Sequence, residues 1–305
     1  MSHRPDTAVI HLVRAVYGVG PFRAFVRSYN EHRAGADHEL VLLCKGFAGG
    51  VLYPEWREVL GATPATALFF PDVGMDISSY FEIAARLGHR YLCFVNTWSR
   101  ILADDWLATL HRYGTAPDVG LVGATAAWYS LYTVNLLSRQ QQSRSDEEAR
   151  QHESALEPMR RYFPPFPNPY IRTNGFFIER TFFASLWGGN GTTKLQALFF
   201  ELGAGGMTRQ TVARGRKALV VGRDGRAYEP ESWPASRTFR AGNQENLLIS
   251  DNRTEMYARA GGSTRAALAW TTWGGAAGDD VPSRMQDVGP VALADVPPGL
   301  FIFPG

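Results

Sequence analysis

Short apolar runs alternate with amphipathic segments over roughly the first 120 residues of the chain, a pattern typical of alternating strands and helices. Between the apolar runs, hydrophobic residues recur at helical spacing, as in the segment that begins at Pro21. Strands that alternate with helices predict a mainly parallel sheet covered on both faces. The predicted strands are Ala8–Val13, Glu39–Cys44, Ala67–Phe70, Tyr91–Val95 and Val119–Ala124.

The pattern changes in the second half of the chain. Residues 140–157 are polar and charged, and their composition fits a solvated helix and a mobile excursion equally well. Clustered prolines at 164–169 predict an extended segment, after which Ile171–Ile178 has the pattern of a further strand. From Ala260 the chain is rich in Gly, Pro and Ala, which predicts loose structure. We therefore expect one domain over residues 1–260 and a C-terminal arm over residues 261–305.

Two of the predicted strands end in polar turns. Pro71–Asp76 follows the third strand, and Asn96–Ser99 follows the fourth. In an open α/β sheet, ligands bind beyond the carboxyl ends of the strands. The two turns are therefore the first place to expect a substrate.

Charge and cysteine content narrow the class of protein. Lys and Arg number 31 against 29 Asp and Glu, which leaves a formal net charge of +2. We expect no nucleic-acid partner, because phosphate backbones are bound by a concentrated basic face. The two cysteines, Cys44 and Cys93, lie in apolar runs and fit buried free thiols in a reducing compartment. A polar leader before Ala8 and no long apolar run predict a cytoplasmic protein without signal peptide or integral membrane segment.

Several common catalytic and cofactor motifs find no support in the sequence. Gly18-Val19-Gly20 lies where a dinucleotide-binding fingerprint would begin, but Arg23 occupies the third glycine position. The second strand ends near Lys45 instead of an acid that would bind a ribose. We find no phosphate-binding GKS or GKT, no GxSxG, no HExxH and no paired CxxC. The glycines fit a tight turn better than a cofactor site.

Four segments together carry a family resemblance. They are the turn PDVGMDI from Pro71, the strand from Tyr91 that runs into Asn96-Thr97-Trp98, the segment PNPYIRTNGFF from Pro167, and Phe200-Glu201 ahead of a glycine-rich turn and Arg209. In order and spacing they resemble the GT-A-type glycosyltransferases, close to the family 2 enzymes and their rhamnan-synthesis relatives. The resemblance covers about residues 8–255. It implies an α/β fold with a GT-A-like, Rossmann-type, mainly parallel sheet.

The resemblance also implies an activity. It predicts a hexosyltransferase-like enzyme that moves a sugar from a nucleotide-sugar donor to a polysaccharide, glycolipid or other carbohydrate or lipid-linked acceptor, with inversion. Glu201 would be the catalytic base on the acceptor hydroxyl. Amides, hydroxyls and carboxylates would bind the donor, Trp98 would stack on a sugar, and arginines would face the diphosphate. The donor-binding candidates are Asp72, Asp76, Asn96, Trp98, Ser99, Arg172, Asn174 and Arg209.

The sequence departs from the family at its metal motif. The Asp-x-Asp that holds a divalent ion in the family is replaced by Asn96-Thr97-Trp98. All seven histidines lie at or before His152, so a late histidine ligand has no candidate. Mg²⁺ and Mn²⁺ prefer oxygen ligands, particularly charged ones. The replacement predicts that a divalent metal is dispensable or weakly bound, with Arg100, Arg172 or Arg209 as counter-charge.

Several of these residues also fit purely structural roles, and the sequence does not choose between the two. Asp76 has the position of a helix cap, and Glu201 ends an apolar helix where an acid commonly faces water. The polar run from Arg240 to Arg253 suits carbohydrate hydroxyls and turns equally well.

Two further classes of protein stay open on the same fold. A non-catalytic nucleotide-sugar or carbohydrate-binding protein would account for the missing acids. A nucleotidyltransferase is the second alternative, but it would need lysine in the loop Ala15–Pro21, which has none.

Overall fold

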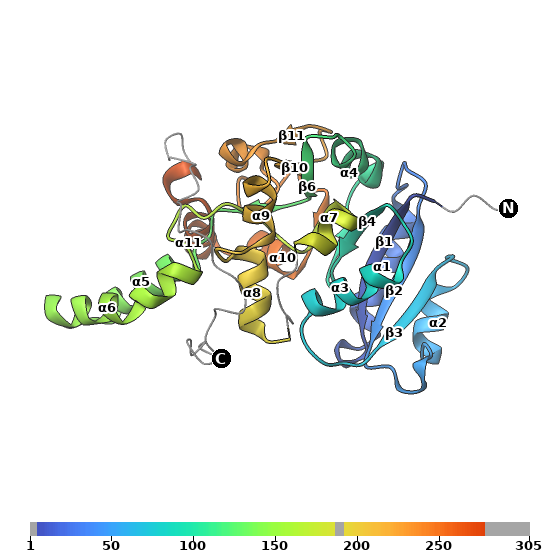
Figure 1. Cartoon of the computed structure of the whole chain (residues 1–305), viewed down its shortest axis with the longest axis horizontal. Coiled ribbons are helices and arrows are strands. Elements are labelled where there is room, and N and C mark those ends of the chain that lie inside the picture. Colours follow the sequence, from blue (N-terminus) through green and yellow to red (C-terminus); the bar gives the residue numbers. More distant parts are fainter. Residues whose placement is uncertain (1–4, 187–191, 278–305) are drawn as a thin grey trace.

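A computed structural model describes residues 5–186 and 192–277 of the 305-residue chain (Figure 1). Within these residues, eight strands form one sheet in the order β11-β10-β6-β9-β4-β1-β2-β3. The strands are β1 (Thr7–Arg14), β2 (Glu39–Lys45), β3 (Thr66–Phe70), β4 (Tyr91–Val95), β6 (Val119–Gly123), β9 (Gly175–Glu179), β10 (Lys217–Val221) and β11 (Ala227–Tyr228). Two further pairs join β5 (Arg100–Ile101) to β12 (Ile249–Ser250) and β7 (Ala126–Ala127) to β8 (Tyr170–Ile171).

The central sheet is mainly parallel, as the sequence predicts. β1 pairs in parallel with both β2 and β4, β2 with β3, and β6 with β10. β9 runs antiparallel between β4 and β6, and β11 runs antiparallel to β10 at the edge. The prediction of one continuous strand over Ile171–Ile178 is wrong, because residues 172–174 turn between β8 and β9. The turn at residues 172–174 therefore comes immediately before β9 and does not lie inside a strand.

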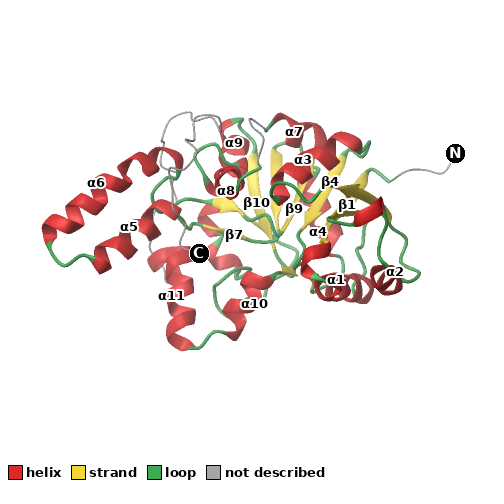
Figure 2. Ribbon diagram, turned by 90° about the horizontal axis from the view of Figure 1, so that it is seen from below, coloured by secondary structure: helices red, strands yellow, loops and turns green. Residues whose placement is uncertain are grey.

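Helices cover both faces of the sheet (Figure 2). The α-helices are α1 (Val19–Glu31), α2 (Pro54–Leu60), α3 (Asp76–Arg86), α4 (Trp106–Gly114), α5 (Leu131–Gln142), α6 (Asp146–Tyr162), α7 (Arg180–Ser185), α8 (Lys194–Leu202), α9 (Met207–Ala213), α10 (Asn252–Arg259) and α11 (Gly262–Trp273). Short 3-10 turns occupy Ala15–Tyr17, Ala48–Gly50, Pro230–Ser232, Pro234–Ser236 and Gly274–Ala277. In Figure 2, α3, α7, α8 and α9 lie on one side of the sheet, opposite α1 and α2.

Alternation along the strands divides the core into two layers. In β1, Ala8 and Ile10 belong to the cluster under α3, α7 and α8, while Val9 and Val13 belong to the cluster under α1, α2 and α4. Successive strand residues point to opposite faces, and because both faces are covered, the strands are apolar throughout. This is why the sequence shows continuous apolar runs instead of alternation. Cys44 and Cys93, as expected, are buried free thiols in the second layer.

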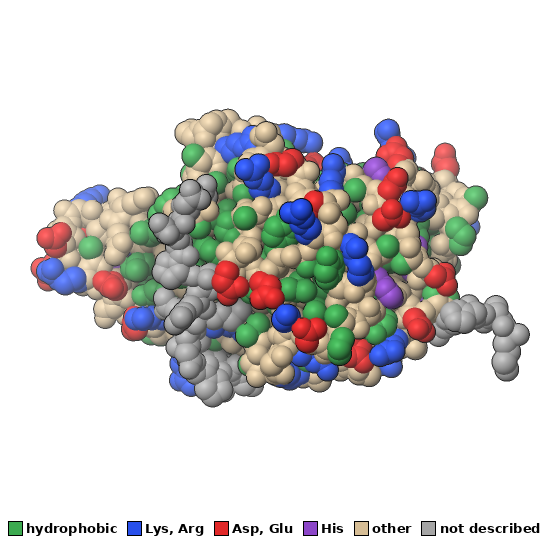
Figure 3. Space-filling model, turned by 90° about the horizontal axis from the view of Figure 1, so that it is seen from above, with side chains coloured by type: hydrophobic (Ala, Val, Ile, Leu, Met, Phe, Trp, Pro, Cys, Tyr) green, Lys and Arg blue, Asp and Glu red, His purple; other side chains and the backbone are tan. Residues whose placement is uncertain are grey.

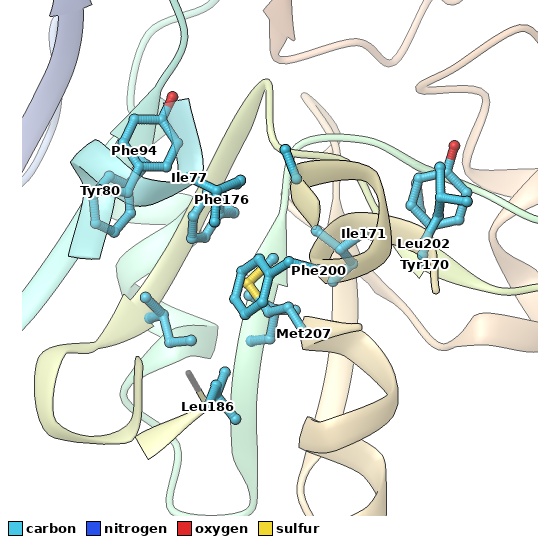
Figure 4. Close-up of a cluster of buried hydrophobic side chains, with 14 of the residues drawn as sticks. Ile77, Tyr80, Phe94, Tyr170, Ile171, Phe176, Leu186, Phe200, Leu202 and Met207 are labelled. Atoms are coloured by element: carbon cyan, nitrogen blue, oxygen red, sulfur yellow. The ribbon is translucent and has the colours of Figure 1, made fainter. Parts of the chain in front are cut away.

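Aromatic side chains fill the first layer beside the carboxyl ends of the strands (Figure 4). The rings of Tyr80 and Phe94 lie 4.6 Å apart between centroids, and those of Phe94 and Phe176 lie 4.9 Å apart. Tyr80 and Tyr170 stand on either side of Phe200, with their hydroxyls directed to the same side of the cluster. The layer therefore joins α3, β4, β9 and α8 into one support.

The polar segment at 140–157 is helical. It forms the end of α5 and most of α6, which lie side by side and project from the sheet (Figure 1). Ser130 and Ser145 cap the two helices by accepting backbone N–H hydrogen bonds. Leu156 and Met159 of α6 are buried in the first core layer. Of the two interpretations of this segment, the solvated helix is confirmed.

The loose structure expected after Ala260 is wrong for the part of the arm that the structure describes. Residues 262–273 form α11, and the indole of Trp273 is only 1% exposed. Trp273 packs against Trp128 at 5.7 Å between ring centroids and donates a 2.7 Å hydrogen bond from Nε1 to the Phe239 carbonyl. The alanines favour a helix here, and the burial of Trp273 holds it against the domain. Residues 278–305 lie outside the described part, and the boundary at 260 stays a prediction.

No helix among the described residues combines the length and the apolar character needed to cross a lipid bilayer.

We predict that truncating Trp273 destabilises the whole domain. Trp273→Ala removes a buried aromatic side chain and should lower the free energy of unfolding by about 3–5 kcal/mol. Trp270 is 53% exposed on the same helix, so Trp270→Ala should change it by less than about 0.5 kcal/mol. Urea denaturation of both variants measures the difference. Equal effects of the two substitutions would show that α11 is not part of the core.

Candidate functional site

The candidate site lies along the carboxyl edge of the sheet. Strand register places Arg14 beside Lys45, and Lys45 beside Phe70, at the ends of β1, β2 and β3. β9 runs the other way, so its first residue, Gly175, pairs with Val95, the last residue of β4. The turn at 172–174 therefore faces the turn after β4. Five separate chain segments meet at this edge, as expected from the parallel sheet.

The turns after β1, β3 and β4 bring two charges and two aromatic rings together. Arg14 donates from Nη2 to Oδ1 of Asp72 at 2.7 Å and from Nε at 3.2 Å. The Arg14 guanidinium also lies over the Tyr17 ring, 5.2 Å from its centroid. Tyr17 and Trp98 are 44% and 40% exposed, and their rings lie 5.5 Å apart. Two exposed rings beside an ion pair form a surface suited to a planar or sugar ligand.

Lys45 fixes the turn that carries the two predicted acids. Its buried ammonium donates to the carbonyls of Val73 at 3.0 Å and Gly74 at 3.2 Å. Burial lowers the pKa of Lys45, and the Arg14 charge lowers it further. Gly74 has a φ of +70°, a conformation that other residues rarely adopt. The lysine and the glycine thus set the path of the chain into α3.

Asp76 is the first residue of α3 and not its N-cap, which is Met75. Its Oδ1 accepts from the backbone N–H of Ile77 at 3.1 Å. Burial raises the pKa of Asp76, against the opposing effects of this hydrogen bond and of the charges of Lys45 and Arg14. Asp76 is only partly buried, so its carboxylate has some access to solvent although its surroundings disfavour the ionised form. The prediction of Asp76 as a cap is wrong, and its role as a ligand stays a prediction.

The polar groups of the turn after β4 are used within the protein. Oδ1 of Asn96 accepts from the Trp98 N–H at 2.9 Å and from the Ser99 hydroxyl at 3.1 Å. Ser99 is fully buried, and its hydroxyl also donates to the Asn174 carbonyl at 2.6 Å. An amide oxygen turned inward is a poor ligand for a hard divalent ion, and this turn has no carboxylate. The residues at the family's metal position therefore do not fit Mg²⁺ or Mn²⁺.

Arg172 and Asn174 form a buried network behind this turn. Arg172 donates to Asp251 at 2.6 Å and to the Thr125 hydroxyl at 3.1 Å. Burial tends to lower the pKa of Arg172. The Asp251 carboxylate outweighs this effect and holds the pKa above its usual value. Asn174 accepts from Thr125 at 2.5 Å and donates to the Ile249 carbonyl at 3.2 Å. The two side chains thus join the turn at residues 172–174 to Thr125, Ile249 and Asp251, and they fix the backbone behind any ligand bound at this edge.

The remaining predicted arginines are also engaged by protein groups. Arg209, on α9, donates from Nη2 to Oδ1 of Asn168 at 3.1 Å. Asn168 in turn donates to the Leu202 carbonyl at 2.7 Å, which ties the proline-rich segment to the end of α8. Arg100 pairs with Glu255 of α10 at 3.0 Å. A role for either arginine as counter-charge to a diphosphate stays a prediction.

Glu201 lies in the last turn of α8, directed toward the strand ends. Its Oε1 accepts from the Thr173 N–H at 2.9 Å and from the Thr173 hydroxyl at 3.1 Å. Burial raises the pKa of Glu201, and the negative charge of Asp76 raises it further. The hydrogen bonds from Thr173 and the charge of Arg172 act in the opposite direction. The side chain is nonetheless partly open to solvent. A positioned carboxylate that takes a proton more readily than usual has the properties of a general base.

Two tyrosines stand on either side of Phe200, the residue that precedes Glu201 (Figure 4). Burial raises the pKa of both Tyr80 and Tyr170, and the Glu201 charge raises each further. Asp76 acts on Tyr80 in the same way. The Tyr80 hydroxyl is buried and has no hydrogen-bond partner among the described residues. The charges of both Asp76 and Glu201 therefore act on the pKa of Tyr80.

Sequence reasoning missed four residues of this edge: Arg14, Tyr17, Lys45 and Tyr80. The first three follow directly at the ends of β1 and β2, so the rule that ligands bind at strand ends would have found them. Tyr80 carried no such signal, because it occurs in a helix at the spacing of ordinary core residues. The two acids that act on it, Asp76 and Glu201, lie far apart in sequence.

Charge on the visible face of the molecule is mixed. Figure 3 shows Lys and Arg interspersed with Asp and Glu, without a large area of one sign on that face. Within residues 5–186 and 192–277, no three or more His, Cys, Asp or Glu side chains are arranged to hold a metal ion.

No protein-family model and no curated protein sequence matches this chain. Solved structures resemble it at a distant level. A mannosyltransferase from Pyrobaculum calidifontis, in complex with GDP-Man and Mn²⁺, is 11% identical over 88% of this chain and 70% of its own, with a TM-score of 0.44. The 4-diphosphocytidyl-2C-methyl-D-erythritol synthase from Anaerococcus prevotii is 13% identical over 70% and 87%, with a TM-score of 0.40. Mouse xyloside xylosyltransferase 1 is 10% identical over 71% and 85%, with a TM-score of 0.41. Likeness at this level does not define a reaction, so the function has to be argued from the residues of this chain.

We predict that divalent metal does not support ligand binding at this edge. EDTA, Mg²⁺ or Mn²⁺ should leave both the unfolding temperature and the affinity for nucleotide ligands unchanged. The turn after β4 has no carboxylate, and its amide oxygen, on Asn96, already accepts hydrogen bonds from the protein. Thermal unfolding and calorimetric titration measure this. Loss of binding in EDTA with recovery in Mn²⁺ would instead point to Asp72 as a metal ligand.

We predict that Glu201→Gln stabilises the protein near neutral pH. A folded-state pKa above the unfolded value contributes stability that is present below the ordinary value of 4.5 and is lost as pH rises through the folded pKa. Glutamine keeps an oxygen for Thr173 but never ionises. The stability gain of the variant should therefore grow from acidic to neutral pH, as measured by urea denaturation across that range. The exposed Glu153→Gln is the matched control and should show no such trend.

Proposed function

We propose that this protein is an inverting GT-A-type glycosyltransferase that moves a sugar from a nucleotide-sugar donor to a carbohydrate or lipid-linked acceptor. One observation carries the proposal: Glu201 is a partly buried carboxylate with a raised pKa, oriented by Thr173 toward the strand ends. The family resemblance of the segments around it supports the same assignment. The charge of Asp76, in a turn that the resemblance assigns to the donor, also raises the pKa of Glu201.

The proposed donor site uses the turns after β1, β3 and β4. Tyr17 and Trp98 provide ring faces on which a base or sugar stacks, and Asp72 and Asp76 accept hydrogen bonds from hydroxyl groups. Arg14 supplies a cation at these turns and pairs with Asp72. Asn96 and Ser99 shape the turn, since their own polar groups are engaged within it.

In the proposed reaction, Glu201 accepts the proton of an acceptor hydroxyl as its oxygen attacks the anomeric carbon of the donor sugar. The new glycosidic bond forms on one face while the bond to the diphosphate oxygen breaks on the other, which inverts the anomeric configuration. The electron pair leaves with the nucleoside diphosphate, and the proton stays on Glu201 until solvent removes it. The hydrogen bonds from Thr173 hold the carboxylate in position for this step.

A second candidate is a nucleotide-sugar-binding protein without turnover. The replacement of the metal-binding acids by Asn96-Thr97-Trp98, with the amide turned inward, favours it. The two candidates share the donor site and differ in whether Glu201 acts on a bound hydroxyl. Donor hydrolysis and transfer assays separate them.

We predict that Glu201→Gln keeps donor binding and loses transfer. Glutamine preserves the shape and the acceptor oxygen for Thr173 but cannot take a proton, so the transfer rate should fall roughly 10²–10⁴-fold. A panel of nucleotide sugars is first screened by thermal shift, since a ligand at 100 times its Kd adds about 2.7 kcal/mol of stability. The ligand found is then used for rate measurements on both proteins.

The control is Glu153→Gln on α6, which should bind donor and transfer sugar like the unmodified protein. Normal transfer by Glu201→Gln would remove Glu201 as the base. Donor binding without hydrolysis or transfer by the unmodified protein, over a broad set of acceptors, would favour the non-catalytic candidate. A panel in which no nucleotide sugar binds would overturn the proposal.

A further inference from the structure

Two arginines share one buried aromatic ring, Phe239. The guanidinium carbons of Arg172 and Arg240 lie 4.0 Å and 4.9 Å from the centroid of the Phe239 ring. Phe239 is 3% exposed and belongs to the first core layer. Two like charges held against one ring repel each other unless anions compensate them.

Only one of these two charges is balanced by the part of the chain that the structure describes. Asp251 pairs with Arg172 at 2.6 Å. Arg240 instead donates from Nη1 to the Thr272 hydroxyl at 3.3 Å, and its Nε is buried without an acceptor among the described residues. A buried donor left without a partner is costly, which favours a ligand that supplies the acceptor.

The backbone fixes Arg240 in this position. Its φ is +46°, in the left-handed region that a long side chain seldom occupies. The Gln244 side chain accepts the Arg240 backbone N–H at 3.0 Å and so holds this conformation. Left-handed residues with strain of this kind cluster at functional sites. The guanidinium is therefore held in place by both the backbone and the Phe239 ring.

Arg253 lies near Arg240, because Gln244, which accepts the Arg240 backbone N–H, also donates to the carbonyl of Thr254. Burial, together with the charges of Arg172 and Arg253, lowers the pKa of Arg240 to about 10. Arg253, in the first turn of α10, is exposed, and its charge also acts on Tyr129. The structure shows no protein hydrogen bond to the hydroxyls of Tyr129 and Tyr170 within residues 5–186 and 192–277. Asp251 and Glu201 are the acids that face this group, and each is already held by other partners.

We propose that Arg240 and Arg253, with the hydroxyls of Tyr129 and Tyr170, bind a phosphate group on the acceptor substrate. The site offers hydrogen-bond donors and two positive charges, and a phosphate has several acceptor oxygens and up to two negative charges. The assignment to the acceptor rests on the proposed function. Tyr170 joins the site to Glu201, so an acceptor anchored here by its phosphate would present a hydroxyl to the base.

The donor side of Glu201 has its own set of charged groups. The charges of Lys45 and Arg14 lower the pKa of Asp76. The pKa of Arg240 depends on a different set of groups, which are Arg172, Tyr170, Arg253 and Asp251. The charge of Asp76 raises the pKa of Glu201, and the charge of Arg172 lowers it. Because different charged groups act at the two places, we treat the phosphate site as separate from the donor turns.

The test is binding of inorganic phosphate to the full chain, followed by calorimetric titration. We expect saturable binding, weakened roughly 10- to 100-fold by Arg240→Gln and about tenfold by Arg253→Gln, since each removes a charged donor. Arg253 is exposed, so its variant should fold whatever happens to the Arg240 variant. Arg259→Gln, an exposed arginine on the same helix, is the matched control and should bind phosphate normally.

Two comparisons distinguish this site from the donor site. Phosphate affinity should be unchanged by Arg14→Gln and by saturating nucleoside diphosphate. Competition with the nucleotide, loss of phosphate binding in Arg14→Gln, or normal binding in Arg253→Gln would overturn the inference, as would no phosphate binding at all. Tighter binding of glucuronate than of phosphate would overturn the choice of phosphate. If phosphate binds as expected and no nucleotide sugar does, the anion site stands and the proposed function fails.

Discussion

The turn at residues 172–174 is the point on which the candidate site depends. The Asn174 carbonyl accepts from the Ser99 hydroxyl at 2.6 Å and from the Asn96 N–H at 3.2 Å, so it fixes the turn after β4. The next residue back, Thr173, holds Glu201, and Arg172 pairs with Asp251. Because β9 runs antiparallel between β4 and β6, its first turn falls at the edge where the parallel strands end. One reversal of strand direction thus brings Glu201, the turn after β4 and Asp251 together.

At this edge, burial changes the pKa values of the charged side chains more than the neighbouring charges do. The charge of Asp76 adds to the effect of burial in raising the pKa of Glu201, while Lys45 is tied to carbonyls and Arg172 to a carboxylate. Replacing Asp251 alone would leave Arg172 buried and unpaired, which is commonly more damaging than replacing both members of a buried pair. The site is therefore coupled to the C-terminal part of the domain through a charge pair as well as through packing.

Aromatic packing gives this arrangement its rigidity. Tyr80, Phe94 and Phe176 stack in series from α3 through β4 to β9, and Phe200 on α8 lies in the same layer (Figure 4). Glu201 directly follows Phe200, so the packing that buries the ring also sets the direction of the carboxylate. The hydroxyls of Tyr80 and Tyr170 are directed to the same side of this apolar layer, and the charge of Glu201 adds to burial in raising the pKa of both.

Local pattern alone determined the strands β1 to β4 and β6, the helices α1, α3 and α4, and the edge at which to search for a site; it did not predict α2. The strands and the edge were predictable because a strand covered on both faces must be apolar along its length, and because polar residues follow where such strands end. Pattern could not show that residues 172–174 form a turn, since Arg-Thr-Asn between apolar residues has the local pattern of one continuous strand. It could not place α11 in the core, because the burial of Trp273 depends on Trp128 and Phe239, which lie far away in sequence. Nor could it find the unbalanced charge of Arg240, which exists only because the nearby acid, Asp251, is taken by Arg172. Contacts between distant segments decided those features, and no local preference encodes them.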